Sequence, residues 1–195
     1  MTLEGITFRF ATPSDAEAIG RLHADSWRRH YRGAYPDAYL DSDLESERIA
    51  FWTERLGEPG DGHFTIVAAQ HGAIVGFAHT RLDADARWGT LLDNLHVRHT
   101  HHQRGLGTAL MARTARILAE RRPSSGLHLW VLKQNTAAQA FYSARGGSCV
   151  EEAAGMVRGG RAAPVLRYAW SDPSVLCPPS APEAASGEAG QPSPT

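Results

Sequence analysis

The sequence Val97-Arg-His-Thr-His-His-Gln-Arg-Gly-Leu-Gly-Thr-Ala-Leu110 joins a strand-like segment to a helix-like segment through a turn of small residues. Apolar residues recur at helical spacing from position 106 onward, so the turn is predicted to lead directly into a helix. The first turn of a helix has unpaired N–H groups and the positive end of the helix dipole. Gly105 and Gly107 place no Cβ in the way of a ligand. This stretch is therefore predicted to bind an anion, and a diphosphate suits it.

The two glycines also have a plainer interpretation, in which they only permit a tight turn. Other phosphate-binding patterns do not fit the stretch. It has no Gly-Lys-Ser/Thr of a P-loop, and its spacing is not Gly-x-Gly-x-x-Gly. A nucleotide hydrolase and a dinucleotide-dependent enzyme are therefore disfavoured.

The sequence on either side of this turn alternates between strand-like and helix-like segments. A hairpin turn is expected at His71-Gly72, and capping boxes are expected at Ser14 with Glu17 and at Thr136 with Gln139. The order predicts one α/β (α+β) domain over residues 1–170, without internal repeats. The expected strands are 6–10, 64–69, 73–82, 91–97, 127–132, 148–152 and 165–170, and the expected helices begin near 14, 46, 106 and 136.

Composition excludes several classes of protein. Lys and Arg number 20 against 21 Asp and Glu, so the chain has no basic excess with which to neutralise a nucleic acid backbone. Residues 171–195 are mostly Pro, Ser, Ala, Gly and Glu, and they are predicted to form a disordered tail. The first residues do not read as a signal peptide, and no apolar run is long enough to span a membrane. With two cysteines and no disulfide framework, the chain is expected in the cytoplasm.

A second pattern follows the apolar segment 127–132. It consists of Asn135, Ala138, Phe141, Tyr142 and Gly146. Together with the first stretch, this pattern resembles the GNAT superfamily of N-acetyltransferases, whose coenzyme A loop reads Val-x-Pro-x-x-Gln/Arg-Gly-x-Gly-Ile/Val/Leu-Gly. The likeness extends over about residues 6–170, and residues 27–40 look like one subgroup of small bacterial members.

The chain departs from the family pattern at three positions in the loop. His99 stands where Pro is usual, His102 where Gln or Arg is usual, and Gln103 where Gly is common. The backbone amides that hold a diphosphate belong to the main chain, so these substitutions leave them in place. Coenzyme binding is therefore expected to persist.

The resemblance implies a mixed, mostly antiparallel central sheet of about seven strands, flanked by about four helices and splayed between the fourth and fifth strands. It implies that acetyl-CoA binds between these two strands, without a metal. Arg104 and Lys133 are candidates to meet the adenosine phosphates. The residues implied to contact the coenzyme are Leu95, His96, Val97, His102, Gln103, Arg104, Gly105, Leu106, Gly107, Thr108, Asn135, Ala138, Phe141 and Tyr142.

The resemblance also implies direct transfer of the acetyl group from acetyl-CoA to an amine. A small-molecule acceptor is the first hypothesis, and a possible homodimer is expected. A peptide or protein amine is the alternative within the same class. A coenzyme-binding sensor or interaction module without turnover is the alternative outside it.

Two proton transfers accompany this reaction. Asp93, His96 and His79 are candidate bases, and each is equally an ordinary polar residue on a strand. Asp93 and His96 are expected on opposite faces of a regular strand, because an odd number of positions separates them, unless a bulge intervenes. Tyr142 matches the family's acid and would otherwise be a core aromatic beside Phe141.

Several further side chains have two possible roles, one functional and one structural. Asn135 either contacts the pantetheine or satisfies the loop backbone. The aromatic residues Trp27, Tyr31 and Tyr35 either line the acceptor pocket or pack a helix on the sheet. The clustered histidines of the loop do not have the spacing of a structural zinc site, so no metal is predicted.

Overall fold

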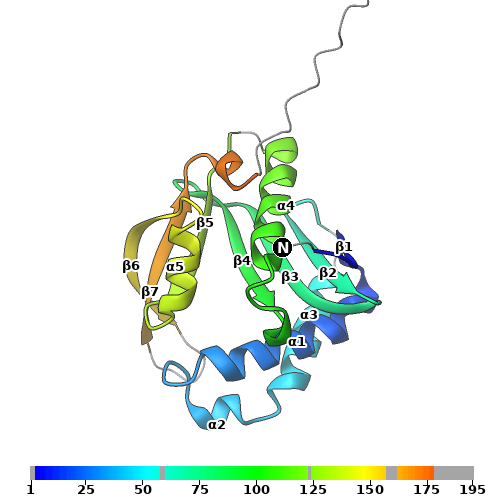
Figure 1. The fold of residues 1–195 in the computed structure, drawn as a ribbon. Coiled ribbons are helices and arrows are strands. Elements are labelled where there is room, and N and C mark those ends of the chain that lie inside the picture. Colours follow the sequence, from blue (N-terminus) through cyan, green and yellow to red (C-terminus); the bar gives the residue numbers. More distant parts are fainter. Residues whose placement is uncertain (1–2, 58–59, 123, 157–161, 178–195) are drawn as a thin grey trace, which may run out of the picture.

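The computed structural model describes residues 3–57, 60–122, 124–156 and 162–177, which contain a single seven-stranded sheet (Figure 1). The strand order is β1-β2-β3-β4-β5-β7-β6, and every neighbouring pair is antiparallel except β4 and β5, which are parallel. This architecture confirms the expected mixed, mostly antiparallel sheet. The strands are β1 (Ile6–Phe10), β2 (His63–Gln70), β3 (Ala73–Asp85), β4 (Gly89–Val97), β5 (Leu127–Leu132), β6 (Ser148–Met156) and β7 (Ala162–Trp170).

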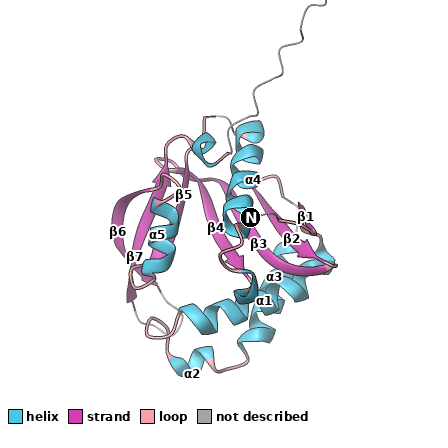
Figure 2. Ribbon diagram, viewed as in Figure 1, coloured by secondary structure: helices cyan, strands magenta, loops and turns pink. Residues whose placement is uncertain are grey.

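The pairing between β4 and β5 is short. Only Thr90 with Leu127 and Leu91 with His128 are in register, and the two strands then diverge (Figure 2). On its far side β5 continues to pair with β7 along its whole length. The sheet is therefore splayed between its fourth and fifth strands, as the resemblance implies.

Helices cover both faces of the sheet, and α4 and α5 lie over the face turned to the viewer in Figure 2. Successive side chains of β2 are buried on opposite faces of the sheet, so helices must pack against both faces. Ile66 and Ala68 are buried in the core beneath α4, whereas Val67 is buried in a second core with α1 and α3. The helices are α1 (Ala16–His30), α2 (Asp37–Leu40), α3 (Leu44–Gly57), α4 (Leu106–Arg121) and α5 (Thr136–Ser143), with short 3₁₀ turns at Pro13–Asp15, His99–His101 and Pro173–Leu176.

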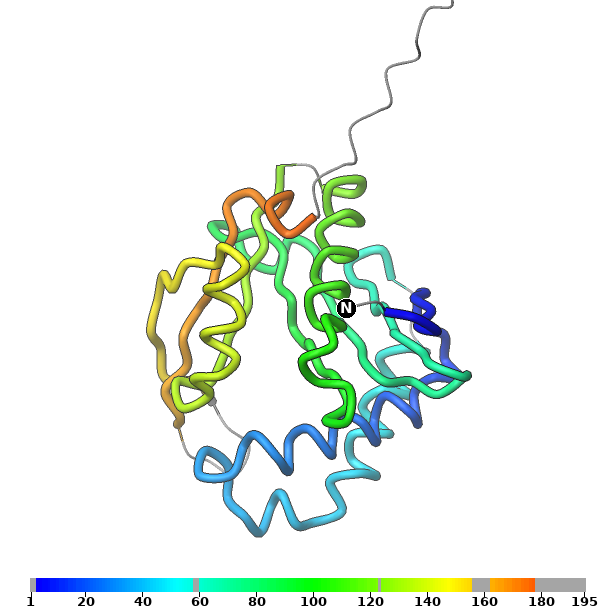
Figure 3. The backbone as a smooth tube through the Cα atoms, viewed as in Figure 1, coloured from blue at the N-terminus to red at the C-terminus, as the bar shows by residue number. Residues whose placement is uncertain are grey.

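The short α2 was not expected, and it belongs to a loop that closes one end of the fold. Figure 3 traces this loop from the end of α1 to the start of α3. Ala34 in the loop packs with Leu132 of β5 and Ala163 of β7. The loop therefore bridges α1 to the distant half of the sheet. No helix in the described part of the chain is long and apolar enough to cross a bilayer.

The first helical turn begins earlier than expected. The predicted capping box of Ser14 with Glu17 is wrong, because the box is formed by Thr12 and Asp15. The backbone N–H of Thr12 donates to Asp15 Oδ2 at 2.8 Å, and the Thr12 hydroxyl lies 3.0 Å from the same oxygen. Pro13 takes the first helical position, where its missing N–H costs nothing, and this places the cap one residue before it.

The capping box predicted for α5 is also displaced. Asn135, not Thr136, is the cap, and its Oδ1 accepts a hydrogen bond from the Ala138 N–H at 3.1 Å. Gln139 does not return to the cap, because its Nε2 donates to the carbonyl of Lys133 at 2.6 Å. Asparagine is a stronger N-cap than threonine, and this preference decides the start of the helix.

The predicted domain boundary at residue 170 lies too early. Residues 171–177 are described, and the turn Pro173–Leu176 packs against α4. Leu176 is 7% exposed and joins the main core, and Cys177 packs beside it. Leu176 and Cys177 thus anchor a segment whose composition is otherwise that of a tail. The remainder of the predicted tail, residues 178–195, lies outside the described residues.

We expect Gly20→Ala to destabilise the fold. A Cβ at this position would lie 2.7 Å from Cα of Ile49, so α1 and α3 would have to separate. Overpacking of this kind costs about 1–3 kcal/mol of unfolding free energy. Denaturant unfolding measures the loss. Gly57→Ala is the matched control, because nothing lies within 4 Å of its Cβ position; equal stability of the two variants would contradict the close approach of α1 and α3.

Candidate active site

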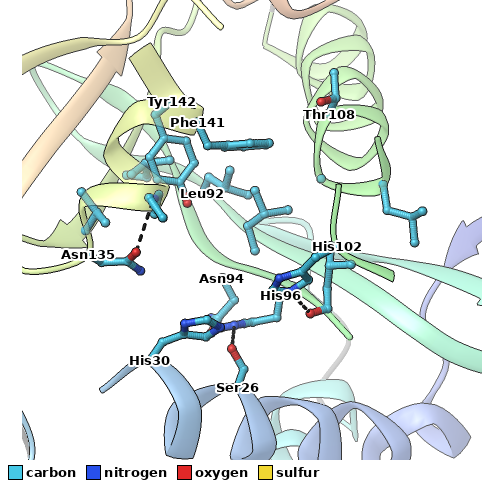
Figure 4. Close-up of a pocket in the computed structure, with 18 of the residues that line it drawn as sticks. Ser26, His30, Leu92, Asn94, His96, His102, Thr108, Asn135, Phe141 and Tyr142 are labelled. Atoms are coloured by element: carbon cyan, nitrogen blue, oxygen red, sulfur yellow. Dashed lines mark hydrogen bonds between the residues drawn. The ribbon is translucent and has the colours of Figure 1, made fainter. Parts of the chain in front are cut away.

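A cavity of about 740 Å³ lies where β4 and β5 diverge (Figure 4). It is lined by α1, β4, the loop after β4, the start of α4, β5 and α5. Segments distant in sequence therefore meet around one space. Every residue implied to contact the coenzyme lines it: Leu95, His96, Val97, His102, Gln103, Arg104, Gly105, Leu106, Gly107, Thr108, Asn135, Ala138, Phe141 and Tyr142.

The edge of β4 that faces this cavity carries backbone groups without strand partners. The N–H of Arg98 donates to the Val75 carbonyl of β3 at 2.7 Å. Because hydrogen-bonding direction alternates along a strand, the backbone groups of Val97 and Leu95 point the other way, into the splay. The Val97 carbonyl accepts from His102 Nε2 at 2.8 Å. The edge therefore offers backbone donors and acceptors to an extended ligand.

The start of α4 forms the other polar end of the cavity. Gly105 has φ +82° and Gln103 has φ +59°, so the loop turns sharply before the helix. No side chain caps the first turn, and its N–H groups are available to a ligand. Gly107 must stay small, because a Cβ there would lie 3.0 Å from the Phe141 ring. These features fit a diphosphate.

Arg145 lines the same end of the cavity and was missed from the sequence. Its Nε donates to Thr108 Oγ1 at 2.9 Å, and its guanidinium lies 3.6 Å from the centre of the Phe141 ring. It therefore adds positive charge beside the first turn of α4. Lys133, predicted for this role, does not line the cavity and pairs with Glu152 at 2.7 Å. No local pattern marks Arg145, because only the approach of α5 to α4 brings it to the site.

The histidines of the loop after β4 cluster with His30 beside the cavity. His102 and His30 of α1 have stacked rings with centroids 6.0 Å apart, and His99 lies 5.4 Å from His102. Burial, followed by the charges of His102 and His99, lowers the pKa of His30. Among the described residues, no three His, Cys, Asp or Glu side chains are arranged to hold a metal ion.

A β-bulge brings two candidate bases to one side of β4. His79 of β3 pairs with Asn94, but Thr80 pairs with Leu92, so Asp93 is the extra residue. Leu92 packs in the core beneath α4, which turns Asp93 toward α1. After the bulge the alternation is reset, and the His96 ring packs on His23 of α1 at 4.7 Å. The bulge is the exception stated for the regular strand, and with it Asp93 and His96 face the same side of β4.

The protein environment shifts the pKa values of Asp93 and His96 in opposite directions. The surrounding protein partly desolvates the Asp93 carboxyl and so raises its pKa, although Arg81 and Arg55 lower it in part and the side chain keeps contact with solvent in the cavity. Burial lowers the pKa of His96 to about 3, and the His96 Nδ1 lies 2.8 Å from Ser26 Oγ. His96 is thus a neutral ring at ordinary pH, whereas the Asp93 carboxylate has an increased affinity for a proton.

His79, the third candidate base, is placed away from the reaction space. It is fully buried and does not line the cavity. Its Nδ1 lies 2.8 Å from Thr65 Oγ1, and its Nε2 lies 3.1 Å from Arg55 Nη1. Both ring nitrogens are engaged by protein groups, so His79 is a structural residue.

Tyr142 lines the cavity from α5. Its ring packs against Tyr168 at 5.8 Å and Trp170 at 6.2 Å. Burial raises the pKa of its phenol to about 12. Tyr142 therefore combines a core-packed ring with a protonated hydroxyl. The two interpretations from the sequence, a core aromatic and a candidate acid, are compatible with each other.

The aromatic residues are arranged in two layers. Tyr31 lines the cavity, whereas Trp27 and Tyr35 do not. The Tyr35 ring stacks on Tyr31 and the Trp27 ring packs against it at a tilt, each with its centre 5.2 Å from that of Tyr31. Trp130 of β5 also lines the cavity and was missed from the sequence. Its neighbours Leu129 and Val131 are core residues, so strand alternation is the signal that would have pointed Trp130 to the other face.

Comparison with known proteins places this geometry in a family context. Residues 24–146 match the model of the acetyltransferase (GNAT) family. The uncharacterized N-acetyltransferase YuaI of Bacillus subtilis is 30% identical over 174 residues, which are 88% of this chain and 96% of YuaI.

Solved structures show the same fold. The PaiA N-acetyltransferase of Thermoplasma acidophilum, determined in complex with coenzyme A, matches with a TM-score of 0.63 and 17% identity, over 87% of this chain and 100% of that chain. NAA60 of Arabidopsis thaliana, in complex with a bisubstrate analogue, matches with a TM-score of 0.64 and 20% identity, over 85% of this chain and 98% of that chain.

We expect Asp93→Asn to increase thermal stability at neutral pH. A carboxyl whose pKa is raised by the fold holds its proton more tightly in the native state. Its ionisation therefore destabilises the native protein above both pKa values, and the penalty is absent below the unfolded pKa. The variant's advantage in melting temperature should grow from pH 4 to pH 7. Asp61→Asn, outside the cavity, should show no such trend, and a variant less stable than wild type at pH 7 would refute the argument.

Proposed function

This chain belongs to the acetyltransferase (GNAT) family, and we propose that it transfers an acetyl group directly from acetyl-CoA to the amine of a small molecule. One observation carries the proposal. The unpaired edge of β4, the carboxylate of Asp93 and the phenol of Tyr142 line one cavity. Each of the three supplies something that amine acetylation requires: oriented polar groups for a thioester, a base and an acid.

The chain holds the coenzyme at two places. The free N–H groups at the start of α4 bind its diphosphate, and Arg145 and Arg104 add positive charge there. The backbone of Leu95 and Val97 orients the pantetheine along β4. When bound, acetyl-CoA supplies an acetyl thioester that an amine can attack.

Asp93 accepts the proton that the amine must lose. An alkyl ammonium has a pKa of about 10, so at neutral pH it enters the site protonated and unreactive. The raised pKa of Asp93 makes its carboxylate a stronger base than a carboxylate with the ordinary pKa. His96 is the weaker candidate because its pKa is lowered to about 3, and its role is to receive hydrogen bonds.

Tyr142 returns a proton to the departing sulfur. An ordinary thiol has a pKa of about 8.5, well below that of Tyr142, so in water this transfer would be unfavourable. Burial raises the pKa of Tyr142, and it acts in the same sense on a thiolate formed in the same cavity. The two pKa values are therefore shifted in the same direction, so burial of Tyr142 alone does not set the gap between the phenol and the thiol.

A backbone N–H on the edge of β4 stabilises the negative charge that develops on the acetyl oxygen. No covalent enzyme intermediate is required. Of the two cysteines, Cys149 is exposed on β6 and Cys177 follows the last 3₁₀ turn, and neither lines the cavity. Direct attack by the amine agrees with this arrangement.

A small acceptor is favoured by the loop after α1. Ala34 packs with Leu132 and Ala163, with Tyr31 and Tyr35 against them, so this side of the acceptor end is walled. A peptide chain needs an open channel, whereas a small amine fits an enclosed end. A peptide or protein amine is the competing acceptor, and a sensor without turnover is the competing function.

The pH dependence of turnover tests the role of Asp93. With a small alkylamine, wild-type kcat/KM should reach a plateau above the pKa of Asp93, because the carboxylate then takes up the amine's proton. In Asp93→Asn the rate should instead keep rising tenfold per pH unit toward the pKa of the free amine. Both profiles are measured by thiol release from acetyl-CoA. Parallel profiles would assign the base to another group.

Replacement of Tyr142 tests the acid and separates an enzyme from a sensor. Tyr142→Phe should lower kcat by about a hundredfold, because the thiolate then takes its proton from water. The dissociation constant of acetyl-CoA, measured by calorimetry, should be unchanged. Tyr168→Phe is the matched control, since it removes a hydroxyl from the ring packed beside Tyr142. A wild-type protein that binds acetyl-CoA but acetylates no small amine or peptide would be the sensor.

A further inference from the structure

We infer that the acceptor is an arylalkylamine: a primary amine joined by a short chain to an aromatic ring, with no carboxylate beside the nitrogen. The inference rests on the proposed function and narrows it to a class of substrate. Two features at the acceptor end carry it. One is the single carboxylate of Asp93, and the other is a wall of aromatic rings contributed by two separate elements.

The charge of Asp93 decides what the nitrogen's neighbours can be. The bulge in β4 directs this carboxylate into the cavity on the side of α1. It attracts an ammonium group, and by the same Coulomb interaction it repels a carboxylate on the adjacent carbon. An amino acid carries such a carboxylate, and the amine formed from it by decarboxylation does not. The site therefore discriminates between the two.

The cationic groups near Asp93 are neutralised or lie elsewhere. The Arg167 guanidinium lies 4.3 Å from the Trp130 ring but is paired with Asp85 at 2.8 Å and Glu151 at 2.9 Å, and Arg104 and Arg145 line the cavity at the start of α4. His96 and His30 line the cavity, and burial lowers the pKa of both, so neither brings a positive charge at neutral pH. Arg55 and Arg81 act on Asp93 from α3 and β3, outside the lining of the cavity. Arg55 is occupied there, with its guanidinium 5.0 Å from the Phe51 ring and 3.1 Å from His79.

The aromatic wall recognises the other end of the acceptor. Tyr31 directly follows α1 and Trp130 belongs to β5, and both line the cavity. Tyr31 is held by the stacked ring of Tyr35 at 5.2 Å and by Trp27 at 5.2 Å, so it is a rigid surface. Flat, preorganised aromatic surfaces bind aromatic rings with little loss of side-chain freedom.

The test uses pairs of substrates that differ only in the carboxylate. Tyramine is compared with tyrosine and phenethylamine with phenylalanine, and putrescine serves as an amine without a ring. Acetylated product is measured by mass spectrometry at saturating acetyl-CoA. We expect each aryl amine to exceed its amino acid in kcat/KM by about tenfold or more, because like charges in a desolvated site are strongly unfavourable. Each should also exceed putrescine.

Asp93→Asn separates charge selection from base catalysis. Loss of the base lowers kcat/KM for an amine and its amino acid by the same factor, and so leaves their ratio unchanged. Loss of the repelling charge lowers the ratio itself toward one. We expect both effects together. An unchanged ratio would overturn the assignment of selectivity to Asp93.

Tyr31→Leu and Trp130→Leu test the aromatic wall, and thermal shift with acetyl-CoA confirms that each variant is folded. Either should lower the preference for phenethylamine over putrescine, whereas Phe10→Leu, an exposed ring on β1, should not. An unchanged preference in both folded variants, or faster transfer to the amino acids or to putrescine by wild type, would overturn the inference alone. Acetyl-CoA binding without acetylation of any amine would overturn the proposed function as well.

Discussion

The end of pairing between β4 and β5 is the constraint on which the rest of the structure depends. Two residue pairs hold these strands together, and beyond them each strand follows its other neighbour. A strand edge inside a protein leaves N–H and C=O groups that must find partners. Here the Val97 carbonyl accepts a hydrogen bond from His102 Nε2, and the other unpaired backbone groups on this edge of β4 face the cavity. The fold is therefore built around an incomplete sheet that an extended ligand completes.

One extra residue in β4 converts this opening into a reaction site. Without the bulge, strand alternation would send the side chains of Asp93 and His96 to opposite faces. With it, Leu92 and Leu95 both pack beneath α4, while Asp93 and His96 both face α1. The apolar residues on either side of the bulge hold it in place, because slipping the register by one position would turn Asp93 into the core beneath α4 and a leucine out of that core. Packing thus maintains the position of the charged group.

The sequence predicts the local elements well and the tertiary neighbours poorly. The bounds of α4 and β5 follow from helical spacing and a short apolar run, and the structure reproduces both. The caps of the first helix and α5 were displaced by one or two residues, since several Ser, Thr, Asn and Asp side chains compete there. Arg145 and Trp130 were missed because only packing between α4, α5 and the sheet brings them to the cavity. A β-bulge also has no residue pattern of its own. From the sequence, the facing of Asp93 and His96 could therefore be predicted only for a strand without a bulge.

Desolvation acts differently on Asp93, His96 and Tyr142, three of the titratable groups that line this cavity. Removal from water disfavours the charged form of each, so it raises the pKa of Asp93 and Tyr142 and lowers that of His96. The carboxylate becomes a stronger base, the phenol keeps its proton, and the imidazole stays neutral. A histidine would be the usual choice of base near neutral pH. The His96 ring packs between Phe77 and His23, which keeps it from this role, and we propose that the Asp93 carboxylate, which the bulge directs into the cavity, serves as the base instead.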